Sequence, residues 1–322
     1  MAVFTPVSEK DAQDLLTQYA LGSLLGLQGI SAGIENTNYF LDTTTGRYVL
    51  TVFEVLSHQQ LPFYIELMHH LAQHKVPVPQ PQTRQDGSRL STLHGKPCAI
   101  VSRLQGRHEP NPGVAHCQLA GATLAQAHLA GRSFSLQQPN LRSLSWWQQT
   151  IPQVLPHLSA QQSQLIQSEL AAQTRFFNSE TFRALPVGPS HCDLFRDNVL
   201  FDGDHQAPVM GGFIDFYFAG CDTWLFDVAV AANDWCIQRP DGHWQEDLLQ
   251  AWLQAYASVR AFTPEEKQAW PMMLRAAALR FWTSRLYDFH LPRAAETLQP
   301  HDPTHFERVL QARILASTPA LP

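Results

Sequence analysis

Two carboxylates and one amide are the side chains of this sequence whose types and spacing are best suited to chemistry. Asp193 and Asn198 lie five residues apart, and Asp215 follows 17 positions after Asn198. A carboxylate can accept the proton of an incoming hydroxyl, and carboxylate and amide oxygens are ligands that Mg²⁺ accepts beside phosphates. The pattern therefore predicts transfer of the γ-phosphoryl group of ATP to a hydroxyl. Asp193 is the expected catalytic base, and Asn198 and Asp215 are the expected ligands of Mg²⁺.

The prediction depends on the whole pattern, because no single part of it is specific for phosphoryl transfer. A His-x-Asp pair such as His191 and Asp193 could be a structural loop, or half of a hydrolase metal site that lacks its other ligands. The Asp-x₄-Asn spacing is followed at once by an apolar strand, and a second apolar strand ends at Asp215. We expect His191 to hold the loop through backbone hydrogen bonds rather than to take part in chemistry.

The elements that must position these residues change in character along the chain. Strand-like patterns over residues 27–55 and 97–104 enclose one helix from Pro62 to about His74, and a hairpin is expected around Asp86 and Gly87. After Gly106 the pattern becomes helical. Helices are expected over 114–130, 144–158 and 161–177, two strands over 199–201 and 209–216, and a helix that starts at Thr263 and is kinked or restarted at Pro271.

The length of 322 residues exceeds what a single core usually supports, so two lobes are expected. The fold class predicted is α+β. Residues 1–103 would form a small antiparallel β lobe that binds the nucleotide. Residues 104–322 would form a larger, mainly helical lobe with the catalytic loop and the acceptor pocket.

Composition excludes several other functions. The net charge is −6 and no basic run occurs, which argues against a nucleic-acid partner. No signal sequence or long apolar run occurs, so no membrane partner is expected. The five cysteines are odd in number and form no CxxC pair, which favours reduced thiols in the cytoplasm. The oligomeric state stays open.

With these residues in view, the chain resembles the aminoglycoside-phosphotransferase-like kinases, which are relatives of protein kinases with the same two-lobed fold. Within that superfamily it most resembles the homoserine kinase branch. The resemblance is carried by the motif from His191 to Asn198, by Asp215, and by segments such as Leu124-Ala-Gln-Ala-His128, Asp222-x₄-Asp227, Glu35-Asn-Thr-Asn-Tyr-Phe40 and Asn233-Asp-Trp235. The matches extend up to Asp288, and residues 292–322 carry no recognisable motif.

The resemblance implies an acceptor and a nucleotide site. The acceptor would be L-homoserine, a small molecule, and the products would be ADP and O-phospho-L-homoserine. Residues 33–38 would form a turn over the phosphates of ATP, with Gly33, Asn36, Thr37 and Asn38 as contacts. Ser102 and Leu104 would lie in the connector that borders the adenine.

One departure concerns the cation that usually contacts the phosphates. Kinases of this fold place a lysine on the third strand, but here Thr51 stands at that position and Glu66 would lack its usual partner. An unpaired polyphosphate would be costly, so another cation is required. Arg196 is the first candidate, with Arg47 and Arg103 as alternatives.

The acceptor pocket is predicted from the charges of homoserine, which is a zwitterion. Arg280 is the candidate for its carboxylate, and Asp234 is the candidate for its ammonium group. Both could equally be ordinary packing residues between helices. Two alternatives stay open: a kinase for another amino alcohol of the choline or aminoglycoside type, and a catalytically silent, kinase-shaped binding protein.

Overall fold

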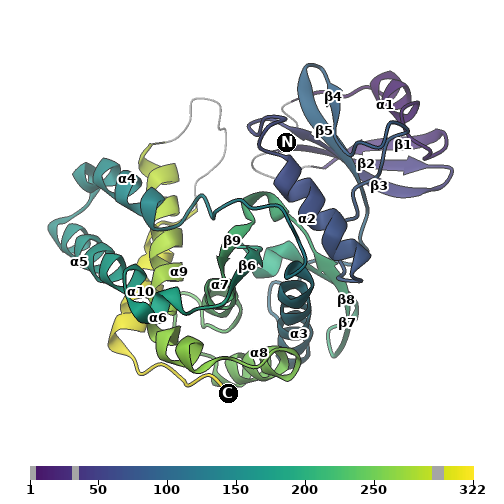
Figure 1. Cartoon of the computed structure of the whole chain (residues 1–322). Helices are drawn as coiled ribbons and strands as arrows, with labels where there is room; N and C mark the ends of the chain where they lie inside the picture. The colour runs from purple at the N-terminus through teal and green to yellow at the C-terminus, as the bar shows by residue number, and fades with distance from the viewer. Residues whose placement is uncertain (1–4, 31–35, 292–300) are drawn as a thin grey trace. The chain divides into compact units, whose positions relative to one another are not determined.

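The computed structural model describes residues 5–30, 36–291 and 301–322. By its internal contacts the chain divides into two compact units. Unit 1 comprises residues 1–106 and 211–214, and unit 2 comprises residues 107–210 and 215–322. Antiparallel strands dominate unit 1 and helices dominate unit 2, as expected for the α+β class (Figure 1).

Unit 1 is built on a five-stranded antiparallel sheet with the strand order β1-β2-β3-β5-β4. Its strands are β1 (Leu24–Gly29), β2 (Asn36–Thr43), β3 (Gly46–Phe53), β4 (Ser91–Leu93) and β5 (Lys96–Ser102). Side chains alternate between the two faces of a strand, so Leu41, Leu50 and Ile100 share one face with Tyr39 and Val52. Helix α1 (Glu9–Leu16) adds Leu15 and Leu16 to this core.

Helix starts in unit 1 follow local sequence signals. At α1, Ser8 accepts a hydrogen bond from the backbone of Asp11, whose side chain accepts one from the backbone of Ser8. Helix α2 (Pro62–Gln73) begins with proline at its first position and buries Phe63, Leu67 and Leu71. A turn does lie at the predicted residues 86–87, where the backbone N–H of Arg84 donates to the oxygen of Ser88 at 2.8 Å, but among the described residues no paired strands flank it. The hairpin of strands β4 and β5 turns at His94 and Gly95, where both residues have positive φ.

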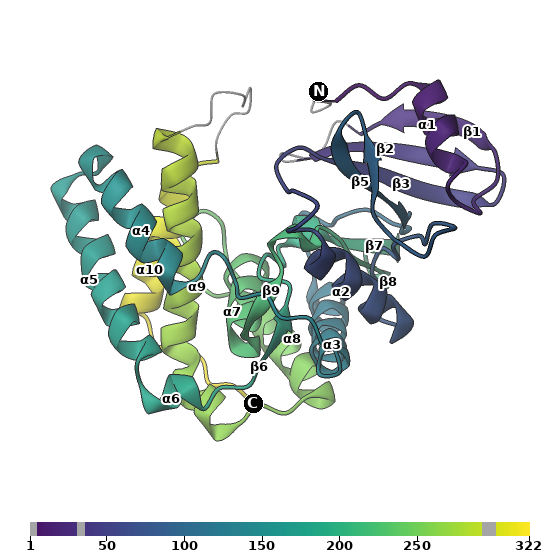
Figure 2. The same cartoon turned by 45° about the horizontal axis from the view of Figure 1, so that its top comes forward.

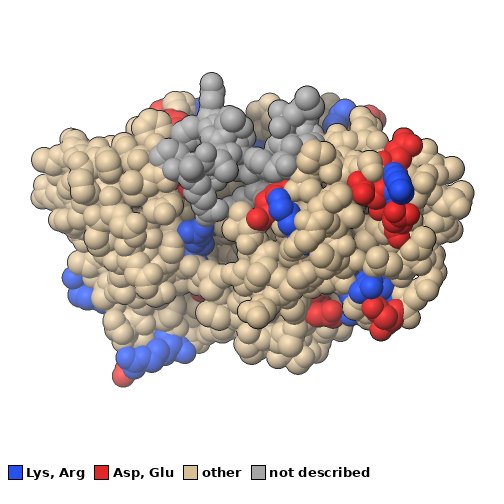
Figure 3. Space-filling model, turned by 90° about the horizontal axis from the view of Figure 1, so that it is seen from above, with Lys and Arg blue, Asp and Glu red and all other residues tan. Residues whose placement is uncertain are grey.

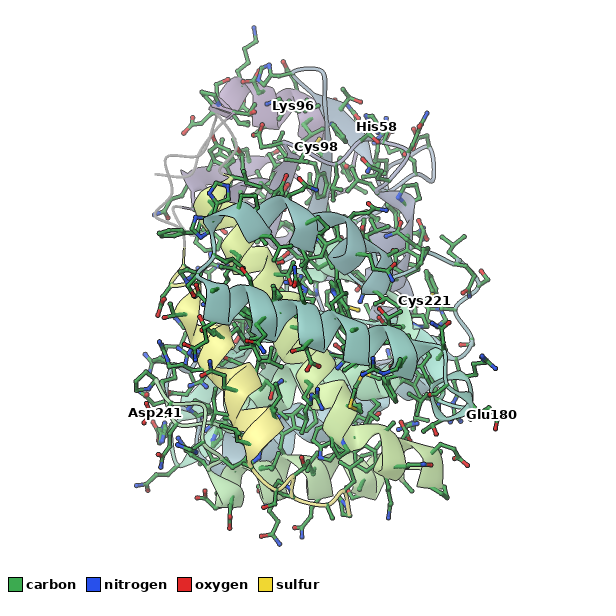
Figure 4. All side chains as sticks on the ribbon, turned by 90° about the vertical axis from the view of Figure 1, so that its left-hand side faces the viewer. His58, Lys96, Cys98, Glu180, Cys221 and Asp241 are labelled. Carbon is green, nitrogen blue, oxygen red and sulfur yellow. The ribbon has the colours of Figure 1, made fainter. Side chains whose placement is uncertain are left out.

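Unit 2 contains most of the helices. They are α3 (Val114–Gly131), α4 (Leu144–Val154), α5 (Ala160–Phe177), α6 (Glu180–Arg183), α7 (Trp224–Trp235), α8 (Glu246–Val259), α9 (Pro264–His290) and α10 (Thr304–Leu315). Figure 2 shows α4, α5 and α10 packed around α9, and Figure 4 shows α4 and α5 side by side in front of that helix. Helix α9 continues through Pro271, so no new helix begins there.

Short strands of unit 2 frame the predicted catalytic motif. Strands β7 (Val199–Asp204) and β8 (Ala207–Phe213) form a hairpin, and β6 (Val187–Ser190) pairs with β9 (Gly220–Thr223). The strand predicted over residues 209–216 ends earlier, at Phe213. The backbone of Asp215 is in the left-handed conformation, and residues 216–218 form a 3₁₀ turn. Strand β6 contains Gly188 and Pro189, and α10 falls in residues 292–322, which carry no recognisable motif.

Helices α3 and α8 approach each other closely at one glycine. A Cβ built on Gly121 would lie 2.4 Å from the carbonyl oxygen of Trp252. Only a residue without a side chain allows this distance, because a methyl group would overlap the backbone of α8. Gly121 therefore sets the separation of the two helices.

The structure describes three properties that the composition bears on: surface charge, helix hydropathy and the state of the cysteines. On the face drawn in Figure 3, Lys and Arg atoms form small separate groups within a largely uncharged surface. Within the part of the chain that the structure describes, no helix combines the length and the apolar character needed to cross a membrane. All five cysteines are free thiols, and four of them are buried.

Candidate active site

The loop before β7 brings Asp193 and Asn198 together. The side-chain amide of Asn198 donates to the backbone oxygen of Asp193 at 2.8 Å and to its carboxylate at 3.3 Å. A 3₁₀ turn over Arg196–Asn198 closes the loop. Because the NH₂ group of Asn198 faces Asp193, its amide oxygen faces away and remains available to a ligand. The two predicted residues therefore form one donor–acceptor unit.

The backbone on either side of this unit is strained. Cys192 has φ 63° and Asp215 has φ 62°, in the left-handed region that residues with a side chain rarely adopt. Such conformations cost roughly 1–3 kcal/mol each and persist only where neighbouring contacts hold them. Cys192 directly precedes Asp193, and Asp215 is itself one of the residues that the sequence marks for chemistry.

Asp227 of α7 supplies those contacts for the 191–193 segment. Its carboxylate accepts the backbone N–H of His191 at 2.7 Å and that of Cys192 at 2.8 Å, and it lies 3.1 Å from Nε2 of His128. Nδ1 of His128 lies 2.7 Å from the hydroxyl of Tyr256. Asp227, fully buried, thus fixes the backbone directly before Asp193 and links it to α3 and α8.

The charge on Asp227 is stabilised by this network. Burial alone raises the pKa of its carboxyl, but the hydrogen bond from His128 and the contacts of His191 lower the pKa overall. Burial also lowers the pKa of His128. These directions favour an ionised carboxylate on Asp227 beside a neutral imidazole on His128.

Asp222 is a second buried carboxyl near the motif. It accepts the side-chain amide of Asn140 at 2.7 Å and the backbone N–H of Thr223 at 2.6 Å. Burial raises the pKa of Asp222 to about 6, and these two hydrogen bonds limit the rise. The carboxyl fastens β9 to the segment before α4, so its role is structural.

Asp215 is connected to the motif through its neighbour. The ring of Phe216 packs on the buried ring of His191, with centroids 4.6 Å apart. This contact ties the turn that follows Asp215 to the loop that carries Asp193. His191 thus acts through its backbone N–H and its ring packing.

Oxygen ligands of the kind that Mg²⁺ prefers are present on this loop, at Asn198, and directly before the turn that follows β8, at Asp215. The amide oxygen of Asn198 is left free by the orientation of its NH₂ group, and the side chain of Asp215 is exposed. Oxygen donors of mixed charge, with room for water, match the ligand preferences of Mg²⁺. The donor set therefore fits the predicted ion.

Arg196 and Asp234 are bonded to each other. Asp234 accepts the backbone N–H of Arg196 at 2.9 Å and its Nε at 3.1 Å, and Nη2 of Arg196 reaches the backbone oxygen of Asp234. Nη1 donates to the oxygen of Pro110 at 2.9 Å, and Arg239 adds a second cation to Asp234 at 2.6 Å. The predicted phosphate cation and the predicted ammonium ligand thus form a buried ion pair, and neither role is tested by it.

Arg280 of α9 is in a different position. It is only 4% exposed, donates to the hydroxyl of Ser284 at 3.2 Å, and lies 3.8 Å over the ring of Phe281. Among the described residues it forms no ion pair within 4.0 Å. Burial lowers its pKa to about 10, and the charge of Asp193 opposes this shift. Within the part of the chain that the structure describes, this buried guanidinium near Asp193 thus has no carboxylate in an ion pair with it.

The nucleotide contacts predicted in unit 1 lie on the sheet. Asn36, Thr37 and Asn38 form the beginning of β2 rather than part of a turn, because they pair with residues 51–53 of β3. The remainder of the predicted turn, including Gly33, lies outside the described residues. Thr37 is fully buried and donates to Glu54 at 2.6 Å. Its side chain is committed to the sheet, and a nucleotide contact through it stays a prediction.

Thr51, which stands where related kinases have a lysine, forms a hydrogen bond within the sheet. Thr51 donates to the side-chain oxygen of Asn38 at 2.7 Å. Glu66 does have a cationic partner, since Nη1 of Arg89 lies 2.9 and 2.8 Å from its two carboxylate oxygens. Arg89 could not be recognised from the sequence as this partner, because it lies 23 residues further along the chain.

The other predicted contacts in unit 1 stay untested. Ser102 ends β5, and its hydroxyl accepts the backbone N–H of Gln80 at 2.9 Å. Leu104 is half-buried beside Gly212. Of the alternative cations, Arg47 is exposed and 3.7 Å from Asp42, and Arg103 lies 3.7 Å over Phe40.

The sequence is similar to known proteins along almost its whole length. A profile of the phosphotransferase enzyme family matches residues 26–262. Homoserine kinase of Burkholderia vietnamiensis is 58% identical over 100% of this chain and 98% of its own length, and that of Paraburkholderia phymatum is 56% identical over 98% of each.

Solved structures give the same fold. An amicoumacin kinase superposes with a TM-score of 0.70 at 13% identity and covers 95% of this chain and 93% of its own. A microcompartment-associated aminopropanol kinase superposes with a TM-score of 0.65 at 17% identity, with 95% and 94% covered. The chain therefore belongs to the phosphotransferase enzyme family and, within it, to the homoserine kinases.

Proposed function

We propose that this protein transfers the γ-phosphoryl group of ATP to the side-chain hydroxyl of L-homoserine. The new bond joins the hydroxyl oxygen to the γ-phosphorus, and the bond between the γ-phosphorus and its bridging oxygen breaks. The hydroxyl proton passes to the carboxylate of Asp193. The products are ADP and O-phospho-L-homoserine.

Asp193 is held ready for this step by its neighbours. Asn198 bonds both the backbone and the carboxylate of Asp193, and Asp227 fixes the two preceding N–H groups. The amide oxygen of Asn198 and the carboxylate of Asp215 would hold Mg²⁺, which would neutralise charge on the phosphates. A base that is positioned in advance does not lose orientation freedom during the reaction.

In this proposal Arg280 determines which acceptor binds, because it pairs with the acceptor's carboxylate. A buried guanidinium without a carboxylate partner is costly unless a ligand pairs with it. The α-carboxylate of homoserine is such a partner, and Arg280 lies within electrostatic range of Asp193. Choline and ethanolamine carry no carboxylate, so the same feature disfavours simple amino alcohols as acceptors.

Arg196 and Asp234 take a different role in this proposal. Because the hydrogen bonds of Arg196 go to Asp234 and to the oxygen of Pro110, we assign the pair to fixing the catalytic loop against α7. A nucleotide contact by Asn36, Asn38, Ser102 or Leu104 in unit 1 remains part of the proposal, as does a cytoplasmic location.

The test compares homoserine with 3-aminopropan-1-ol, which is homoserine without its carboxylate. Release of ADP from Mg·ATP is followed with each acceptor. We expect kcat/KM to be at least ~100-fold higher for L-homoserine, because a site built for a polar group strongly rejects an analogue that lacks it. Equal values would remove Arg280 from acceptor recognition. No ADP release with any hydroxylated amine would favour the silent binding protein instead.

A further inference from the structure

Three metal-ligating side chains meet in unit 2 at the opposite end of β7 from Asn198. Glu109 lies in the loop before α3, His116 in the first turn of α3, and His205 in the two-residue turn between β7 and β8. One ligand atom from each of the three side chains lies within 4.8 Å of the others. We refer to these residues as the His₂Glu cluster.

Surrounding contacts orient each member of the cluster. The backbone N–H of Asn111 donates to one carboxylate oxygen of Glu109 at 2.9 Å, and the other oxygen lies 3.2 Å from Nδ1 of His205. The backbone N–H of Gly113 donates to Nδ1 of His116 at 3.2 Å, so this nitrogen is unprotonated, as a metal-binding imidazole must be. These contacts hold the Glu109 carboxylate and the two imidazole rings close together before an ion binds.

The framework under the cluster is firm, and its outer side is open. His116 is 2% exposed, and its ring packs edge-on against Phe201 of β7 with centroids 4.8 Å apart. Arg107 and Phe201 exchange two backbone hydrogen bonds, which hold the loop against the hairpin. The side chain of His205 is 57% exposed and that of Glu109 is 22% exposed, so an ion and its water could enter from solvent.

The cluster is separate from the residues proposed for Mg²⁺. Asn198 immediately precedes β7 and His205 immediately follows it, so the six residues of the strand lie between them. At about 3.3 Å per residue, the two positions are roughly 20 Å apart. The two sites also differ in chemistry, since imidazole nitrogens suit zinc, and oxygen ligands suit magnesium.

We propose that Glu109, His116 and His205 bind one divalent transition metal ion of the zinc class. Three protein ligands of this kind leave a fourth position for water, as in open zinc sites. The ion would replace the Gly113 N–H at Nδ1 of His116 and would join the loop, α3 and the β7–β8 turn. It would not take part in phosphoryl transfer.

Zinc binding to the full-length protein tests the proposal, by titration calorimetry in the presence of Mg²⁺ in large excess. We expect one Zn²⁺ per chain and a rise of the melting temperature with bound zinc. His205→Gln changes an exposed side chain and should leave the fold intact. It should weaken zinc binding by at least ~100-fold, because loss of a ligand costs more than loss of a second contact. Glu109→Gln should act in the same direction.

The matched control is His74→Gln on α2. His70 and His74 lie one turn apart with ring centroids 4.2 Å apart, and such a pair can bind metals weakly. This variant should bind zinc as the unchanged protein does. Absence of zinc binding, equal affinity in His205→Gln, or loss of binding in His74→Gln would each overturn the assignment.

Discussion

Replacing Arg280 by methionine tests two effects of its buried charge separately: the loss of folding stability and the binding of the acceptor carboxylate. Burial holds the pKa of Arg280 at about 10 instead of 12.5. At about 1.4 kcal/mol per pKa unit, the charged form loses on the order of 3 kcal/mol in the folded protein at neutral pH. Methionine is also unbranched, reaches as far as the Nε position of arginine, and can lie on the same aromatic rings, Phe218 and Phe281. Loss of the ring contact and of the Ser284 hydrogen bond offsets about 1–2 kcal/mol.

We therefore expect Arg280→Met, without substrate, to be more stable than the unchanged protein by about 1–2 kcal/mol in urea unfolding. Its kcat/KM for L-homoserine should fall at least ~100-fold, mainly through KM, since the substrate carboxylate loses its partner. Activity with 3-aminopropan-1-ol should change little. Arg280→Lys is the control, because it keeps the charge but not the planar pair of donors.

An Arg280→Met variant that is less stable than the unchanged protein, with an unchanged KM for homoserine, would refute the proposed role of Arg280 in binding the acceptor. That result would make Arg280 a packing residue of α9. A loss of activity with both acceptors alike would instead indicate a general disturbance of Asp193, which the charge of Arg280 also reaches.

Three further outcomes follow from the site. Asp193→Asn should lower kcat by at least ~100-fold while calorimetric ATP affinity is kept, and near-normal turnover would show that another group is the base. Asp234→Leu should destabilise the protein by about 3–5 kcal/mol in urea unfolding, and adding Arg196→Met should recover most of the loss; additive losses would contradict the ion pair. The pKa of the Asp222 carboxyl is 3.8 in the unfolded chain and is raised to about 6 in the folded protein. The protonated carboxyl therefore contributes its full stability below pH 3.8, and this contribution is lost as the pH rises through 6. Asp222→Asn should gain about 1–2 kcal/mol relative to the unchanged protein between about pH 5 and about pH 7.5, and a constant difference would refute the shift.

Elements that depend on local signals could be predicted from the sequence. The helix that begins at Thr263 was expected because a capping side chain and its partner, Glu266, lie three residues apart. The Asp193–Asn198 unit was also expected, since both residues lie on one short loop. In each case the interacting groups are neighbours along the chain.

Features that depend on distant residues could not be predicted in this way. Strand β6 pairs with β9, more than 30 residues later, and its own sequence is rich in Gly and Pro. The partner of Glu66 is Arg89, and the partners of Asp227 lie 35, 36 and 99 residues away. The sequence marked Asp227 only through its spacing from Asp222. Nothing in that spacing indicated that its carboxylate holds the catalytic loop.

The contact at Gly121 has a consequence for residues that are far from it. Helix α3 carries His116 in its first turn and His128 in its last, and Gly121 lies between them. A methyl group at residue 121 would push α3 away from Trp252 of α8 as a rigid rod. Gly121→Ala would thereby displace a proposed zinc ligand and the imidazole that supports Asp227, although residue 121 itself has no polar side chain.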